Sequence, residues 1–421
     1  MITLSFWFVN TFYKLIAFFF KMFYANYIKK ERVQFMEMTN LSNRDVNEIK
    51  LLGSIIEHQP ISRANLAKLN ELNKTTTSAV VNNLIEEQLV YESGVGSSTL
   101  TGGRKPILLE FNPKTAVAIS IELGQNYIQS CLAYLNGEII HYQEEKTALI
   151  ESDTIVDTLK GLINQHLGHL PETPNGLVGI TVGIHGVTLN NQITFSPFYD
   201  FTELDIHGCL QSTYQCPVYL ENEANLSAIG EYTFVTDQDR IINVNIKSGI
   251  GAGVIQFGKL MTGTHGRFGE IGHTILFPGG RPCPCGNLGC LERYASSKAL
   301  FRSIKERMDI DFIEVDELIK LWHQGEPIIT EEVTQVIDYL SVGINNLISS
   351  YDPDEVIING MIFNRIPALL DLLTAKLNRR IAQDTKLSVS RLTDMATIYG
   401  GIAVVGSRYL NIEDLKLQGD H

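Results

Sequence analysis

Three cysteines and one histidine stand close enough together in the sequence to bind a metal ion. Cys283, Cys285 and Cys290 lie in one short segment, and His273 precedes them. Zn²⁺ binds such sets of three thiolates and one imidazole in a closed tetrahedron. Buried free thiols, or a disulfide between two of the cysteines, are the alternatives, and the tight spacing favours zinc over both. The other cysteines fit no such spacing and are expected in the core: Cys131, Cys209 and Cys216.

The region after residue 45 has the pattern of three consecutive helices. Apolar residues recur at helical spacing from Asn47 and stop at Gln59-Pro60. Ser62 can cap a short second helix, and after a polar turn a third helix is predicted from Lys74 to about Gln88. This order is typical of a helix-turn-helix, whose second helix enters a major groove of DNA. The side chains predicted to face DNA from this helix are Lys74, Thr75, Thr76, Ser78 and Asn82.

A glycine- and serine-rich loop at 94–103 separates two apolar runs, 89–91 and 107–109, and is followed by Arg104 and Lys105. Two strands around such a tip indicate a wing whose two cations contact phosphate or the minor groove. An ordinary three-helix module with a solvated hairpin is the alternative. The order of elements and the polar start of the third helix favour DNA binding.

The charge of the chain limits what kind of DNA-binding protein it could be. The formal net charge is −13, which excludes a protein that coats nucleic acid over its whole surface. With 44% hydrophobic and 19% charged residues, the composition also excludes a disordered chain. We therefore expect a folded protein that contacts DNA through one module only.

After Pro113 the pattern changes to alternating strands and helices. Strands are predicted at 116–121, 129–134, 137–143 and 176–182, with a helix at 153–167 before the last of them. The same order returns at 240–246, 251–256, 259–261 and 356–358. A strand-rich unit used twice, with helical insertions, predicts an α/β body of the actin-like, hexokinase-like type, in which two lobes close on a cleft.

Five motifs follow one another in this body: Gly183-Ile184-His185-Gly186, Leu220–Asn225, Ser248–Gly253, Gly269–His273 and Cys283–Glu292. Together they resemble the motifs of the ROK family, which is named for repressors, open reading frames and sugar kinases. The resemblance covers about residues 45–410, and its last two motifs are highly specific. With a helix-turn-helix in front, the chain is most similar to the xylose-repressor branch of low-GC Gram-positive bacteria. The resemblance implies that the zinc is structural.

The resemblance also implies a sugar site. Fixed carboxylates and amides hold the hydroxyl groups of polyols. His273 would use one ring nitrogen for zinc and the other for a hydroxyl, so that the metal fixes its tautomer. Any one of these carboxylates alone would more often be a surface or capping group, but their place inside the motifs indicates the sugar. The implied sugar-site residues are Asn222, Glu223, Glu270, His273 and Glu292.

Three motifs that face ATP in the related kinases are altered, so we predict no catalytic residues. The first hairpin reads Glu122-Leu123-Gly124-Gln125-Asn126 where the kinases have Asp-x-Gly-Gly-Thr, so the second Gly and the Thr are missing and with them a backbone cradle for phosphate. Glu223 stands where the kinases carry an aspartate base, and the added methylene moves the carboxylate by about 1 Å. The adenosine motif reads Asn359-Gly360-Met361, and only Gly249–Gly253 is well preserved. Phosphoryl transfer is expected to be lost and sugar binding retained.

Residues 1–35 do not resemble the rest of the chain. They are rich in phenylalanine, and their apolar run contains Lys14 and Lys21, which are costly inside a membrane. No cleavage site of a signal peptide follows. The first interpretation is upstream DNA translated from a wrongly assigned start, with Met36 or Met38 as the true first residue. An amphipathic membrane anchor is the second interpretation and a spanning helix the third.

The sequence thus predicts a cytoplasmic transcriptional repressor that binds operator DNA as a dimer and releases it when sugar binds. D-xylose is the first candidate inducer, and glucose or its 6-phosphate is a possible competitor. The alternatives are an active sugar kinase with an appended DNA-binding module and a repressor controlled by a protein partner. The predicted domains are an uncertain extension at 1–35, a winged helix-turn-helix at 36–112 and a two-lobed ROK sensor at 113–421.

Overall fold

The computed structural model describes residues 44–96, 105–146, 151–197, 199, 201, 203–377 and 380–417. The interpretations of residues 1–35, and the predicted DNA contact of Arg104, lie outside these ranges. Within the ranges, no helix combines the length and the apolar character that a membrane crossing requires.

The first described elements are three helices followed by a hairpin, in the predicted order. Ser62 caps the second helix by accepting from the Asn65 backbone N–H, and Asn73 caps the third by accepting from that of Thr76. Leu51, Leu66 and Leu84 are fully buried where the helices meet. The elements are α2 (Val46–His58), β1 (Ile61–Ser62), α3 (Arg63–Leu69), α4 (Lys74–Glu86), β2 (Val90–Val95) and β3 (Ile107–Phe111), with β3 between β1 and β2.

The next part of the chain forms a five-stranded sheet of order β10-β7-β4-β5-β6. β4 pairs antiparallel with β5 and parallel with β7, which places the carboxyl ends of β4 and β7 at the same edge. Two helices, α5 and α6, bury their apolar side chains against this sheet. The elements are β4 (Val117–Leu123), β5 (Tyr127–Tyr134), β6 (Ile139–Lys146), α5 (Ile155–Leu167), β7 (Leu177–Ile184), β8 (Val187–Leu189), β9 (Gln192–Phe195), α6 (Ile206–Tyr214) and β10 (Val218–Asn222).

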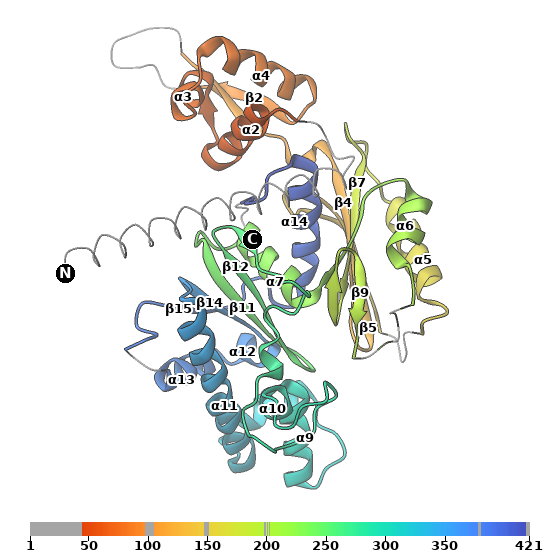
Figure 1. Cartoon of the computed structure of the whole chain (residues 1–421), viewed down its shortest axis with the longest axis vertical. Helices are drawn as coiled ribbons and strands as arrows, with labels where there is room; N and C mark the ends of the chain where they lie inside the picture. Colours follow the sequence, from red (N-terminus) through yellow and green to blue (C-terminus); the bar gives the residue numbers. More distant parts are fainter. Residues whose placement is uncertain are drawn as a thin grey trace, which may run out of the picture. The chain divides into compact units, whose positions relative to one another are not determined.

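A second five-stranded sheet, of order β13-β12-β11-β14-β15, repeats the pattern of the first, as the sequence predicted (Figure 1). Its helices are inserted between β13 and β14 and after β14, and they carry a separate apolar core. The elements are β11 (Arg240–Ile246), β12 (Ile250–Gln256), β13 (Lys259–Leu260), α8 (Glu292–Ala295), α9 (Ser297–Met308), α10 (Val315–His323), α11 (Pro327–Tyr351), β14 (Glu355–Asn359), α12 (Met361–Arg365), α13 (Ala368–Lys376) and β15 (Lys386–Val389).

Two helices connect the sheets. α7 (Glu223–Phe234) packs on β11 and β12, α14 (Ala396–Leu410) packs on β4 and β7, and the two helices pack on each other. Glycine allows this close approach, since a Cβ atom on Gly400 would lie 1.8 Å from the carbonyl oxygen of Leu226. The start of α7, which carries Glu223, is therefore held at a fixed place between the two sheets.

Candidate functional site

The predicted metal ligands His273, Cys283, Cys285 and Cys290 meet in one cluster, with all their ligand atoms within 4.8 Å of one another. The Cys283 Sγ atom lies 3.6 Å from His273 Nδ1, and the Sγ atoms of Cys285 and Cys290 are also 3.6 Å apart. Zinc bonds of about 2.0–2.3 Å in a tetrahedron place neighbouring ligand atoms about 3.4–3.8 Å apart. The donor set and its spacing therefore fit zinc.

The chain folds tightly around this cluster. Gly286 and Gly289 have φ values of 93° and 88°, in the region that favours glycine. A Cβ atom on Gly289 would lie 1.7 Å from the carbonyl oxygen of Phe277, so no other residue fits there. The Cys283 backbone N–H donates to the carbonyl of Asn287 and closes the loop. These contacts hold the thiols in place without a disulfide bond.

All six cysteines are free. Cys131 and Cys216 are buried, as expected for core residues. Cys209 is exposed, so its expected place in the core was wrong: it lies on α6, where only Ile206 and Leu210 are buried.

The imidazole of His273 faces the thiols with one nitrogen and a carboxylate with the other. Its Nδ1 atom lies beside Cys283, and its Nε2 atom lies 3.7 Å from an oxygen of Glu270. Glu292 is 3.7 Å from Nδ1 and accepts a hydrogen bond from the Cys283 thiol at 3.1 Å. A zinc ion would be held through Nδ1, which leaves Nε2–H directed toward Glu270 and able to donate to a hydroxyl.

Three half-buried carboxylates, those of Glu223, Glu270 and Glu292, lie near the cysteine cluster. Burial, together with the charges of Glu223 and Glu292, raises the pKa of Glu270 to about 7. The glycine-rich hairpin that joins β11 and β12 lies close to these carboxylates. A Cβ atom added to Gly249 would be 3.0 Å from a carboxylate oxygen of Glu292. A Cβ atom on Gly251 would likewise be 3.9 Å from Glu223. Carboxylates gathered in this way can accept hydrogen bonds from several adjacent hydroxyl groups.

Asn222 caps α7 and orients the next residue. Its side-chain oxygen accepts from the backbone N–H groups of Ala224 and Asn225, and its Nδ2 atom donates to Gly186 and to Glu223. A hydrogen bond from Asn222 to a sugar would therefore replace the bond to Glu223, which is 3.0 Å long. The five predicted sugar-site residues thus come from β10, the start of α7 and the loops around the cysteine cluster.

Beside these residues lies a buried network that the sequence did not predict. Oε1 of Glu122 accepts hydrogen bonds from Lys247 at 2.6 Å, Tyr127 at 2.8 Å and His185 at 3.3 Å. The other ring nitrogen of His185 lies 3.8 Å from Glu223. Burial alone raises the pKa of Glu122, but Lys247 and His185 hold that pKa well below its usual value. The signal in the sequence was a lysine directly before the glycine-rich hairpin.

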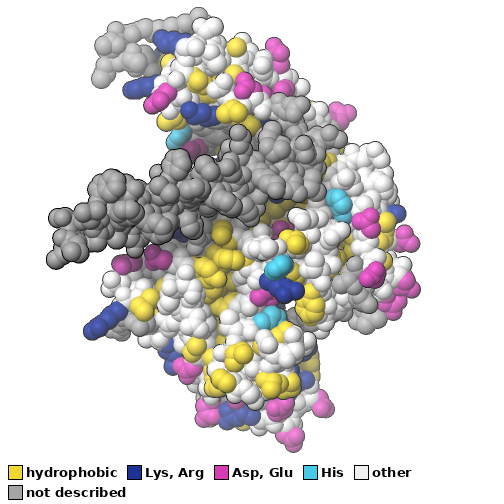
Figure 2. Space-filling view, viewed as in Figure 1, with side chains coloured by type: hydrophobic (Ala, Val, Ile, Leu, Met, Phe, Trp, Pro, Cys, Tyr) yellow, Lys and Arg dark blue, Asp and Glu magenta, His cyan; other side chains and the backbone are white. Residues whose placement is uncertain are grey.

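The predicted DNA contacts lie on α4 and at the base of the hairpin. Lys74, Thr75, Asn82 and Lys105 are exposed, whereas Thr76 and Ser78 are half-buried. On the face seen in Figure 2, basic and acidic side chains alternate over this module. A surface space of about 510 Å³ adjoins α4 and β2, and Arg63, which the sequence did not single out, reaches Asn82 at 2.8 Å and Glu92 at 3.2 Å there.

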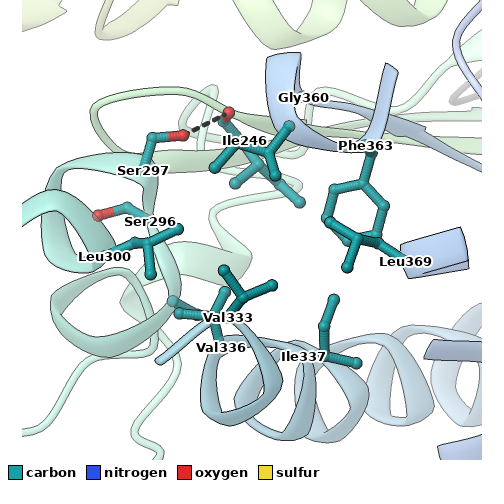
Figure 3. A pocket seen from close by; sticks show the side chains of 12 residues that line it. Ile246, Ser296, Ser297, Leu300, Val333, Val336, Ile337, Gly360, Phe363 and Leu369 are labelled. Carbon is teal, nitrogen blue, oxygen red and sulfur yellow. Dashed lines mark hydrogen bonds between the residues drawn. The ribbon is translucent and has the colours of Figure 1, made fainter. Parts of the chain in front are cut away.

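A second space lies where the kinase resemblance places adenosine, around Gly360 after β14 (Figure 3). Its free volume is about 20 Å³, roughly the space of one water molecule. Apolar side chains fill the remainder, among them Ile246, Phe363 and Leu369, which Figure 3 shows facing one another.

The model of the ROK family matches residues 118–409 of the chain. The xylose repressor of Bacillus spizizenii (strain ATCC 23059 / NRRL B-14472 / W23) is 33% identical over 380 residues, which is 88% of this chain and 97% of that protein. The family match therefore includes the two sheets, the cysteine cluster and the carboxylates described above.

Two solved structures share the fold. A ROK family transcriptional regulator, described as a homologue of the Escherichia coli MLC protein, has a TM-score of 0.74 at 24% identity. It covers 88% of this chain and 98% of its own. A ROK family glucokinase from Streptomyces griseus, in complex with glucose and AMPPNP, has a TM-score of 0.61 at 24% identity and covers 68% of this chain and 98% of its own. The same body is therefore found in a regulator and in a kinase.

Proposed function

Because the chain belongs to the ROK family, we propose that it is a sugar-responsive transcriptional repressor of the xylose type. Sugar binds between the two sheets of the body, and the N-terminal module then releases operator DNA. One observation supports this proposal most strongly: the same chain has a cluster of half-buried carboxylates and an exposed polar face on α4.

The N-terminal module, predicted at 36–112 and described over 44–96 and 105–112, is a winged helix-turn-helix. α3, the turn at 70–73 and α4 form the helix-turn-helix, and β2 with β3 forms the wing. Lys74, Thr75 and Asn82 are exposed on α4, and Thr76 and Ser78 adjoin them. Lys105 and the sequence-predicted Arg104 contact phosphate from the wing. The protein acts as a dimer, because two recognition helices about 34 Å apart read two half-sites.

The sugar site is formed by Asn222, Glu223, Glu270, His273 and Glu292, in the sensor at 113–421. The carboxylates accept from sugar hydroxyls, and Nε2–H of His273 donates to one. Structural zinc, held by His273 and the three cysteines, fixes that ring and the loop that carries Glu292. D-xylose is the proposed inducer, with glucose or its 6-phosphate as competitor, and the protein works in the cytoplasm, where operator DNA is present.

The chain is not a kinase in this proposal, and the ATP-facing residues support that. The ring of Tyr127 lies over Gly124 in the first hairpin, where a Cβ atom would be 2.2 Å from it, and the Gly124 backbone N–H already donates to the Tyr127 carbonyl rather than to a phosphate. Lys247 and Glu122 occupy the adjoining space with an ion pair. The adenosine space is filled by apolar side chains. These three features favour sugar sensing over phosphoryl transfer.

A gel-shift titration tests the proposal. DNA bound by the purified protein is first selected from a random duplex pool, and its dissociation constant is then measured with D-xylose, D-glucose, glucose 6-phosphate and no sugar. D-xylose is expected to weaken binding at least tenfold. Release by no sugar would support control by a protein partner instead, and consumption of ATP with any of these sugars would support the kinase alternative.

A further inference from the structure

We propose that the ion pair between Glu122, which is fully buried, and Lys247, which is 23% exposed, is the connection through which an occupied sugar site changes the relative position of the two lobes. The lobes are defined here by the two five-stranded sheets. The inference rests on the proposed sugar-responsive function and adds the residues that couple sugar to DNA.

The two partners come from different lobes. Glu122 is on β4 of the first sheet and is completely buried, whereas Lys247 directly follows β11 of the second sheet. Their charged atoms are 2.6 Å apart. Because each side chain is anchored on its own sheet, a change in the separation of the lobes must stretch or break this contact.

The pair is linked to the sugar site by one imidazole. The Nε2 atom of His185 lies 3.3 Å from the same Glu122 oxygen that accepts from Lys247, and its Nδ1 atom lies 3.8 Å from Glu223. This 3.8 Å separation is longer than a hydrogen bond, so a sugar hydroxyl bound to Glu223 would lie within reach of Nδ1 of His185. Sugar binding therefore changes the hydrogen bonding of His185, and through it the charge balance at Glu122.

Stability alone is a weak reason for such a pair. Buried ion pairs are often no more stabilising than well-packed apolar residues, because both charges lose their hydration. Oε2 of Glu122 is buried and has no hydrogen-bond partner among the described residues, which adds to the cost. This contact is costly to bury, yet it joins two lobes beside the proposed sugar site. We therefore infer that it serves to change the conformation rather than to stabilise the packing.

The other residues of the site explain why this contact is needed. Glu270, His273 and Glu292 all lie between β13 and β14 of the second sheet, and Glu223 starts α7, which packs on that sheet. Of the five residues, only Asn222, at the end of β10, belongs to the first sheet. Sugar can therefore bind mainly to the second lobe. The pair supplies the additional contact with the first lobe.

The test compares the wild-type protein with Lys247→Met, which removes the charge and keeps most of the volume. For each protein, operator affinity is measured without sugar and with D-xylose at a concentration that calorimetry shows to be saturating. The ratio of the two dissociation constants is the coupling between the sites. We expect Lys247→Met to bind operator and sugar but to lose most of the coupling, with a ratio at least fivefold smaller than that of the wild type.

Two further proteins make the result specific. Lys259→Met is the matched control, because Lys259 forms an equally short pair with Glu413, but on the surface, and should keep the wild-type ratio. The double variant Glu122→Gln with Lys247→Met leaves no uncompensated buried charge, so it serves if the single variant does not fold, and it should also lose the coupling. The reversed pair, Glu122→Lys with Lys247→Glu, should regain part of it.

A wild-type ratio in either Lys247→Met or the double variant would overturn the inference and leave the proposed function intact. A wild-type protein whose operator affinity does not respond to any sugar would overturn the proposed function, and the inference with it.

Discussion

The Nδ1 atom of His273 lies 3.6 Å from the thiol sulfur of Cys283, while its Nε2 atom faces away from the cysteine cluster. One side chain thus belongs to both a metal centre and a group of carboxylates. A structural ion at Nδ1 would fix the ring so that Nε2–H stays directed toward the proposed sugar site. Loss of the metal from this ring is therefore expected to weaken sugar binding as well.

The first prediction concerns metal content. Elemental analysis of protein purified without chelators should find about one zinc per chain. Cys285→Ser should lower this content and the melting temperature, because structural zinc contributes folding free energy directly. Cys209→Ser is the control, since Cys209 is exposed and lies outside the cluster. Wild-type protein without zinc would contradict the assignment.

The second prediction concerns Glu223. Removal of a charged partner from a buried hydroxyl typically costs about 1.5–3 kcal/mol, or roughly ten- to a hundredfold in affinity. Glu223→Ala should therefore bind operator normally without sugar but need far more D-xylose for release, which makes it a super-repressor in cells. Sugar sensitivity equal to that of the wild type would remove Glu223 from the site.

The third prediction separates sugar binding from catalysis. Glu223→Asp restores the carboxylate of the related kinases, but Tyr127 still lies over Gly124 and apolar side chains still fill the adenosine space. We expect no sugar-dependent ATP consumption from this variant or from the wild type in a coupled assay. Turnover by either protein would show that the altered motifs still bind nucleotide.

The fourth prediction concerns DNA. Lys105→Ala should weaken binding to all sequences and reduce the slope of log affinity against log salt by about one unit, because one phosphate contact is lost. Asn82→Ala should instead change base preference and leave the salt slope unchanged. Lys320→Ala, on an exposed helix of the body, is the control. An unchanged salt slope in Lys105→Ala would argue against the wing.

The fifth prediction concerns acid stability. His166 is fully buried between Ser130 and His141, and burial together with His141 and His169 lowers its pKa to about 4. The unfolded chain, with a usual pKa near 6.5, therefore binds more protons between these values. Stability should fall as pH drops from about 6.5 toward 4, by up to about 3 kcal/mol.

His166→Gln should show a shallower loss of unfolding free energy between pH 7 and 5 than the wild type. His323→Gln should keep the wild-type slope, because His323 is exposed at the end of α10 and lies outside this histidine cluster. Loss of zinc at low pH affects all three proteins, so the difference between their slopes isolates the histidine. Equal slopes for wild type and His166→Gln would contradict this account.

Local patterns in the sequence predicted most of the fold. Ser62 was identified as a helix cap because an oxygen at that position satisfies a free N–H group, and the structure has that bond. The cysteine cluster was predictable because its members are close in the chain. Cys209 was misplaced, because a cysteine is usually buried, and only the packing of α6 shows which of its faces is covered.

The network around Glu122 could not be predicted in this way. Glu122 and Lys247 are separated by 125 positions and meet only because two lobes come together. Nothing in the local sequence of either residue indicates its partner, and a lysine before a glycine-rich hairpin is compatible with an exposed side chain. Contacts between distant elements are set by topology, which the spacing of residues does not determine.

The most direct test of the central claim is the operator affinity of the purified wild-type protein, measured in a gel shift with and without saturating D-xylose. The account predicts specific binding without sugar and at least tenfold weaker binding with it, with no ATP required. Operator binding that no sugar changes, at concentrations where calorimetry detects sugar bound to the protein, would contradict it.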